Sequence, residues 1–252
     1  MTEIFLLSFI QGITEFLPVS SSSHLILFSE YSNFQAKSLS IDVSLHIGSF
    51  LAVLTYFFKD IMNFIKNRLL LFKIFISSIP VMLIGYFLVE TNLIENLRNI
   101  KVIAWTTLIF GILLHISDKY NIDKNIEKDF NFKSAIFIGF FQIISLIPGV
   151  SRSGITLTAA RLLNFNRVDA AKISFLLSIP TLGAVSIFGL KNIIYAGDLN
   201  FSFMNLFSIF TSFLFSLLTI KFFLKYLKKF NLKVFVIYRI FLGIILLFLS
   251  YL

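Results

Sequence analysis

Two polar stretches interrupt an otherwise apolar sequence, and they hold the residue types that could do chemistry. The first, QGITEFLPVSSSSH (residues 11–24), contains a glutamine, a carboxylate, four serines and a histidine. The second, PGVSRSGIT (148–156), places an arginine between serines after a Pro-Gly break. A guanidinium and free backbone N–H groups at a helix start bind anions, and serine or histidine can act as nucleophile or base. Together the two stretches predict an anion site capable of group transfer.

The spacing within the first stretch places polar side chains on shared helix faces. Gln11 and Glu15 are four residues apart, so on a helix they lie side by side. Pro18 is expected to end that helix, because the residue before a proline is disfavoured in the α conformation. The serines can then cap the next helix, where His24 lies three or four residues after two of them.

The ionisable residues of the two stretches are predicted to pair. An unpaired carboxylate at membrane depth would cost several kcal/mol, so Glu15 needs a partner, which Arg152 can supply. A pair that only stabilises the fold is the simpler interpretation. The Ser, Thr and His residues around the pair favour a cage of donors suited to a phosphate group instead.

The composition indicates an integral membrane protein with several spans. Of 252 residues, 57% are hydrophobic and 14% are charged, and the mean hydropathy is +0.89. The chain has no cysteine, which excludes disulfides, thiolate catalysis and cysteine-bound metals. The net charge of +9 is read as a topology signal rather than as a nucleic-acid interface. The apolar N-terminus lacks a basic leader and is expected to be retained.

Six segments are long and apolar enough to cross a bilayer as helices. They are expected at 41–58, 74–90, 101–117, 168–190, 201–220 and 234–252. Residues 1–40 and 134–163 are apolar but contain the polar stretches, so each is predicted to form a re-entrant helical hairpin. Irregular backbone at that depth is tolerated only where protein or a water-filled cavity surrounds it.

The basic residues predict how these segments are oriented. Most lysines and arginines fall in four connections, at 59–73, 119–133, 161–172 and 221–233, which are therefore expected to be cytoplasmic. The chain then forms one all-α membrane domain (1–252) built as an inverted repeat. Its halves are 1–117 and 134–252, each a hairpin followed by three spans, and the polar cytoplasmic loop 118–133 joins them. Both polar stretches would meet near the bilayer midplane.

Three other polar residues are assigned no chemistry. His46 and His115 have no charged partner at motif spacing, so structural or interfacial roles are expected for both. Arg239, near the inner end of the last span, is expected to extend its side chain to the membrane interface.

Both polar stretches resemble motifs of a known family. QGITEFLPVSSSSH is similar to the (E/Q)-x-x-x-E motif and Ser/His region of undecaprenyl-diphosphate phosphatases of the bacitracin-resistance type, and PGVSRSGIT is similar to their PGxSRSxxT motif. The resemblance covers essentially the whole chain. It implies hydrolysis of undecaprenyl diphosphate to undecaprenyl phosphate and inorganic phosphate, which recycles a lipid carrier for cell-wall synthesis and confers bacitracin resistance.

The resemblance also implies site residues. Catalytic roles fall on Glu15, Ser21, His24 and Arg152, and substrate-binding roles on Gln11, Ser20, Ser151, Ser153 and Thr156. Ser21 is the expected nucleophile, with Glu15 or His24 as its base. Direct attack by His24, or by a water that Glu15 activates, stays open.

Gln11 stands where many members have glutamate, which weakens the case for a metal held by the protein. Glu15 remains the candidate ligand, and a divalent cation, Mg²⁺ or Ca²⁺, is expected to arrive with the diphosphate. No organic cofactor is expected. The expected partners are a polyprenyl diphosphate lipid and the bilayer, without nucleic acid, and a homodimer is allowed. The expected location is the bacterial plasma membrane, with the site near the midplane and open to the outer face.

Two other functions would share part of this sequence pattern. An inverted-repeat transporter or polyprenyl-phosphate flippase without hydrolysis would share the broken helices, but it would need no nucleophile beside the anion site. An acid-phosphatase type of lipid phosphatase would need a histidine six residues after Arg152, where Thr158 stands.

Overall fold

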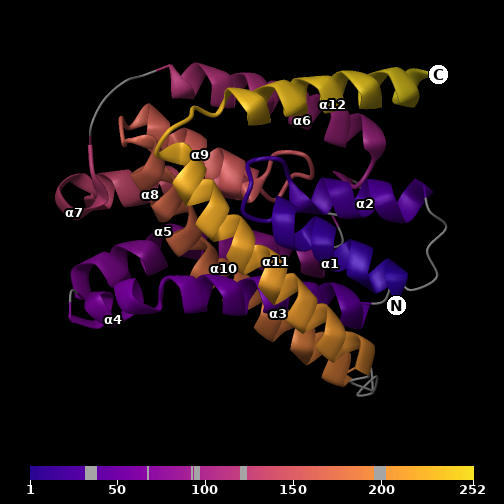
Figure 1. The fold of residues 1–252 in the computed structure, drawn as a ribbon, viewed down its shortest axis with the longest axis horizontal. Helices are drawn as coiled ribbons and strands as arrows, with labels where there is room; N and C mark the ends of the chain where they lie inside the picture. Colours follow the sequence, from indigo (N-terminus) through magenta and orange to yellow (C-terminus); the bar gives the residue numbers. More distant parts are fainter. Residues whose placement is uncertain (32–38, 67, 92, 94–96, 120–123, 196–202) are drawn as a thin grey trace.

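The computed structural model describes residues 1–31, 39–66, 68–91, 93, 97–119, 124–195 and 203–252, and in these residues it contains helices and no β-strand (Figure 1). The helices are α1 (Thr2–Thr14), α2 (Ser21–Tyr31), α3 (Leu39–Tyr56), α4 (Phe58–Lys66), α5 (Arg68–Glu90), α6 (Ile100–Asp118), α7 (Ile126–Asp129), α8 (Phe132–Ile144), α9 (Arg152–Leu162), α10 (Arg167–Tyr195), α11 (Phe203–Leu227) and α12 (Lys233–Tyr251). Six of them, α3, α5, α6, α10, α11 and α12, are long and apolar enough to cross a membrane. The all-α fold with six candidate spans is therefore confirmed.

The core lies between α3, α10 and α11. Helix α10 packs against α3 and α5, and α11 packs along α3 and against α1. Aromatic rings fill the space between these helices, because Phe175 of α10 contacts Phe16, Phe57 and Phe223 edge-on or tilted. The remaining spans α6 and α12 pair with each other beside this core (Figure 1).

The two short helices that begin the halves of the chain pack in corresponding ways. Helix α1 lies against α11, and α8 lies against α5. The approach is close in both cases, since a Cβ at Gly12 would collide with Phe215 and one at Gly139 would collide with the backbone of Ser77. An inverted repeat would produce this exchange. The repeat, its boundaries and the re-entrant path of the hairpins stay predictions.

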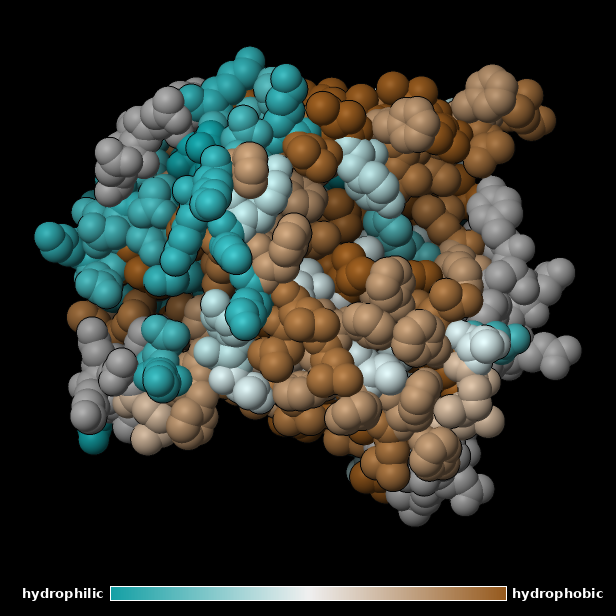
Figure 2. Space-filling view, in the orientation of Figure 1, coloured by the Kyte–Doolittle hydropathy of each residue, from teal (hydrophilic) through white to brown (hydrophobic). Residues whose placement is uncertain are grey.

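The basic connections meet at one end of the molecule. The Asp118 carboxylate, which ends α6, forms an ion pair with Arg167 (2.7 Å) and accepts a hydrogen bond from the backbone N–H of Leu232 (3.0 Å). Lys73 donates to the Phe130 carbonyl (2.7 Å). Figure 2 shows hydrophilic residues gathered over the end that carries α7, whereas most of the remaining visible surface is apolar. This arrangement supports placing the four basic connections on one side of the membrane.

Residues 118–133 are more ordered than the solvated loop that was expected. Ile126 in α7 and Phe130 after it are buried, and the backbone of Lys124 pairs with that of the α9–α10 turn. The described part of this segment thus packs onto the helices, and residues 120–123 lie outside the description. In the first predicted hairpin, residues 32–38 also lie outside it.

Candidate active site

Two turns carry the polar stretches. Helix α1 ends at Thr14, earlier than Pro18 was expected to end it, and the first turn (residues 15–20) leads into α2. Helix α8 ends at Ile144, and the second turn (residues 145–151) leads into α9. The four helices around the turns have 11 to 13 residues, too few to cross a bilayer. Residues of both turns are buried, among them Phe16, Ser20 and Ser151.

The two turns end in the same unusual backbone conformation. Ser20 and Ser151, the residues that precede α2 and α9, have φ values of +75° and +73°. Non-glycine residues rarely adopt this left-handed region, and they do so where the surroundings force them to. A buried glutamine lies nine residues before each serine, Gln11 in α1 and Gln142 in α8. The turns thus present two helix N-termini built on one plan.

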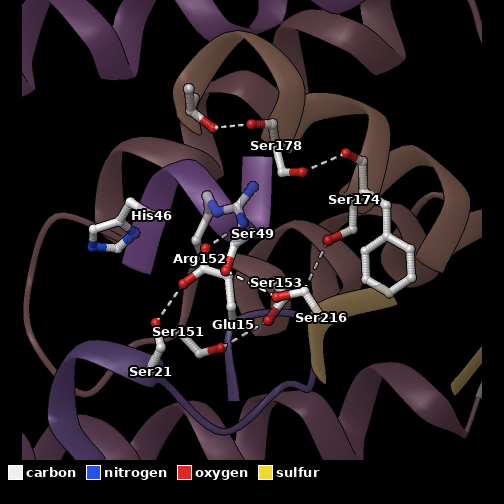
Figure 3. A network of polar contacts seen from close by, with 12 residues as sticks. Glu15, Ser21, His46, Ser49, Ser151, Arg152, Ser153, Ser174, Ser178 and Ser216 are labelled. Carbon is white, nitrogen blue, oxygen red and sulfur yellow. Dashed lines mark hydrogen bonds and ion pairs between the residues drawn. The ribbon is translucent and has the colours of Figure 1, made fainter. Parts of the chain in front are cut away.

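The Glu15 carboxylate joins the two turns. It is 7% exposed, and its Oε1 pairs with the Arg152 guanidinium at 2.6 Å (Figure 3). Its Oε2 accepts a hydrogen bond from the Ser21 hydroxyl (2.6 Å) and one from the Gln11 amide (3.1 Å). The predicted pair is present, and the carboxylate of the first turn meets a hydroxyl of α2 and a guanidinium of α9 in one cluster.

Arg152 retains an unused donor beside this cluster. Its second terminal nitrogen, Nη1, is buried and has no hydrogen-bond partner among the described residues. Because a buried guanidinium N–H is costly to leave unpaired, the position suits an anionic ligand. The neighbouring Ser153 hydroxyl donates to the Leu17 carbonyl (2.7 Å) and so ties α9 to the first turn.

The hydroxyl groups of Ser20, Ser151 and Thr156 bond to groups other than the Glu15 carboxylate. Ser151 caps α9 by accepting from the Gly154 N–H (3.1 Å), whereas the Ser20 hydroxyl contacts those of Ser22 and Ser23. Thr156 donates to the Ser174 hydroxyl of α10 at 2.7 Å.

His24 lies apart from the Ser21–Glu15 pair. Its Nδ1 is 2.6 Å from the Ser20 carbonyl, which can only accept, so Nδ1 carries the proton. Its Nε2 is 2.5 Å from the Tyr238 hydroxyl, and the two rings stack. In the neutral ring Nε2 then accepts from Tyr238, and no bond to Ser21 is present among the described residues. Both ring nitrogens of His24 are occupied, and of the two candidate bases only Glu15 is hydrogen-bonded to Ser21 in the described residues.

The structure adds site residues that the sequence did not indicate. His46 of α3, for which a structural or interfacial role was expected, lies 3.1 Å from the Gln11 amide nitrogen. Arg239 was expected to reach the interface, and this is wrong because its side chain is fully buried against both turns. No motif spacing links these residues to the polar stretches. His115 is exposed, in keeping with an interfacial role.

The described residues do not fit a metal held by the protein alone. They contain no group of three histidine, aspartate or glutamate side chains placed to hold an ion. Both Glu15 oxygens already accept hydrogen bonds, one of them from a cationic guanidinium that would repel a metal ion.

Known proteins are similar to this chain over nearly its whole length. The model of the family "Bacitracin resistance protein BacA" matches residues 4–245. A protein of Pelagibacter ubique named undecaprenyl-diphosphatase is 52% identical over 250 residues, which cover 99% of this chain and 97% of that one. Relatives with the same name in Jannaschia sp. (39% identical; 98% of each chain) and Hahella chejuensis (40%; 96% of this chain and 95% of that one) are also similar.

Proposed function

The chain belongs to the bacitracin resistance protein BacA family, and from this membership we propose that it is an undecaprenyl-diphosphate phosphatase. It hydrolyses the phosphoanhydride of undecaprenyl diphosphate and yields undecaprenyl phosphate and inorganic phosphate. The lipid product re-enters cell-wall synthesis, and its faster recycling confers bacitracin resistance. The observation that carries the proposal is the Ser21–Glu15–Arg152 cluster, in which a hydroxyl is bonded to a base beside a cation.

In the proposed mechanism, Ser21 is the nucleophile. Its hydroxyl already donates to Glu15 Oε2 at 2.6 Å, so Glu15 can take the proton as Ser21 Oγ attacks the terminal phosphorus. The anhydride P–O bond breaks, and undecaprenyl phosphate leaves. Glu15 passes its proton to the leaving lipid phosphate and is a carboxylate again. A water molecule then attacks the phosphoserine while Glu15 accepts a proton from it. The bond between phosphorus and Ser21 Oγ breaks, Oγ takes the proton back from Glu15, and inorganic phosphate departs.

Charge on the transferring phosphoryl group is balanced by Arg152 and the helix starts. The unpaired Arg152 Nη1 is available for a phosphoryl oxygen, and backbone N–H groups at the starts of α2 and α9 add partial positive charge. Gln11 supports the Glu15 carboxylate. A divalent cation travels with the diphosphate rather than with the protein.

The depth of the cluster supports a site near the bilayer midplane. Arg152 begins α9 and Arg161, near its other end, lies against Asp118 at the basic end of the molecule. The 11 residues of α9 span about 16 Å, roughly half of a 30 Å hydrocarbon layer. We place the protein in the bacterial plasma membrane with its basic end in the cytoplasm and the site open to the outer face. A homodimer remains a prediction.

Phosphate release tests the proposal. Purified wild-type protein should release inorganic phosphate from undecaprenyl diphosphate, whereas Glu15→Ala and Arg152→Ala should lose most of this activity. A phosphoserine trapped at Ser21 by rapid quenching would identify the nucleophile. Wild-type protein that moves the lipid across liposomes but releases no phosphate would instead indicate the transporter.

A further inference from the structure

Arg239 of α12 is a buried cation that the proposed mechanism does not use. Its side chain is fully buried, and four of its hydrogen bonds go to backbone carbonyls. The acceptors are Thr107 of α6 (3.2 Å), Pro18 of the first turn (3.2 Å), and Gly149 (2.9 Å) and Val150 (3.0 Å) of the second turn. One guanidinium therefore joins both turns and a spanning helix.

The contacted carbonyls lie next to the strained ends of the turns. Val150 directly precedes Ser151, and Pro18 lies two residues before Ser20. Both serines have positive φ, a conformation that persists only where neighbouring groups over-determine it. Ser151 and Ser20 are in turn followed by Arg152 and Ser21. The direction in which these two side chains leave the turns thus depends on carbonyls that Arg239 holds.

The surroundings are shaped to a guanidinium. The three nitrogens of the planar guanidinium donate to carbonyls that lie in different directions, whereas a lysine ammonium has all its donors on one nitrogen. A Cβ at Gly111 of α6 would lie 3.0 Å from the Arg239 Cβ, so the helix opposite has a glycine where the arginine stem passes.

We propose that Arg239 is a positioning residue that holds the first and second turns together, so that Ser21 and Arg152 meet at the same Glu15 carboxylate. Arg239 has no hydrogen bond to these three side chains in the described structure, so it acts through the backbone. The inference rests on the proposed function for its catalytic consequence, but the geometry it describes can be measured separately.

Arg239→Lys is the main test, and Arg161→Lys is its matched control. Arg161 is also buried and donates to backbone carbonyls, of Phe165 (2.6 Å) and Asp118 (3.4 Å), but it lies toward the other end of α9. Arg239→Lys should lower kcat about 100-fold, because a shift of about 1 Å in reacting groups has that effect. Arg161→Lys should lower thermal stability by a similar amount and keep kcat within about threefold of wild type.

Combining substitutions separates positioning from general damage. In an Arg152→Ala background, Arg239→Lys should lower the remaining activity by less than about threefold, because the aligned guanidinium is already gone. Independent, multiplicative losses would overturn the proposal. Gly111→Ala, which crowds the Arg239 stem from α6, should lower kcat about tenfold and carries the same test if Arg239→Lys does not fold.

A distance measurement decides the inference without any activity. The chain has no cysteine, so Ser22→Cys and Ile147→Cys can carry a single pair of spin labels, one beside each turn. Dipolar coupling between the labels should weaken or broaden with Arg239→Lys and stay unchanged with Arg161→Lys. Unchanged coupling in both variants would reject the proposal, whereas absent phosphate release by the wild type would reject only the phosphatase.

Discussion

The first and second turns share a backbone plan but carry different chemistry. Each has a serine with positive φ directly before a helix, and a buried glutamine nine residues before that serine. Four residues after Gln11 stands Glu15, and four residues after Gln142 stands Leu146. Ser21 follows Ser20, and Arg152 follows Ser151. The first turn and the helix after it therefore carry a carboxylate and a hydroxyl, and the second turn leads to a cation.

The contrast shows how one local structure can serve two roles. The shared backbone delivers two helix starts to one place, where their N–H groups favour an anion. In the proposed mechanism, the side chains at corresponding positions divide the work of nucleophile activation and charge neutralisation. The Gln142 amide, without a counterpart of Glu15 beside it, has no hydrogen bond at either of its polar atoms in the described structure.

The largest expected effect comes from removing the carboxylate that distinguishes the turns. Glu15→Gln should lower kcat/KM for phosphate release about 1,000-fold, because Ser21 loses its proton acceptor and Arg152 loses its ion pair. At the corresponding position of the second turn, Leu146→Gln should change the activity by less than about threefold. Similar losses in both variants would mean that the turns are not functionally distinct.

Replacing the cation should have the next largest effect. Arg152→Lys keeps the charge but loses the two-nitrogen guanidinium. One of these nitrogens pairs with Glu15, and the other is available to a ligand. We expect about a 100-fold fall in kcat/KM, measured by steady-state phosphate release. Activity equal to wild type would show that charge alone is needed, and Arg152→Ala sets the lower limit.

The two buried glutamines provide a matched pair. Gln11→Leu removes a hydrogen bond to Glu15 and should lower kcat/KM about tenfold, equivalent to about 1.4 kcal/mol. Gln142→Leu removes an amide without a partner and should leave activity unchanged while raising the melting temperature. A loss with Gln142→Leu that equals the loss with Gln11→Leu would assign the second glutamine a role in the site.

The smallest effects are expected at Ser20 and Ser151, the serines with positive φ that precede α2 and α9. Ser20→Gly relieves a positive φ without removing a bond to a backbone N–H, so it should raise the melting temperature by about 2 °C. Ser151→Ala keeps the positive φ and removes the cap on Gly154, so it should lower the melting temperature by about 2 to 4 °C. Opposite signs in thermal melts in detergent would confirm that only the second serine caps its helix.

Much of the fold was predictable because membrane insertion constrains the sequence strongly. A helix that crosses lipid must be long and apolar, so the six spans were recognisable, although α5 begins at Arg68 and α11 extends to Leu227. The burial of Ile126 and Phe130 was missed, because the charged residues around them resemble those of a solvated loop. Phe130 packs against Phe165 of the distant α9–α10 turn, and the backbone N–H of Ile126 donates to Asp169 of α10.

The candidate site was predictable where its residues lie in the two polar stretches. Glu15 and Arg152 were expected to pair because a buried carboxylate needs a cation, and the second stretch offered one. The structure also shows that Ser21 faces Glu15 while His24 faces Tyr238, a choice that spacing on a helix left open.

The sequence by itself determined an all-helical membrane protein with two polar breaks and a carboxylate–arginine pair, because hydrophobicity and the cost of buried charge act on short segments. Only the tertiary structure decided the roles of His46, Tyr238 and Arg239. Each meets its partner across a distance in the sequence that no local periodicity encodes. An arginine near the end of a span is typical of an interfacial anchor. Arg239 is buried instead, because the packing of α12 against α6 brings it within reach of three carbonyls of the turns and one of α6.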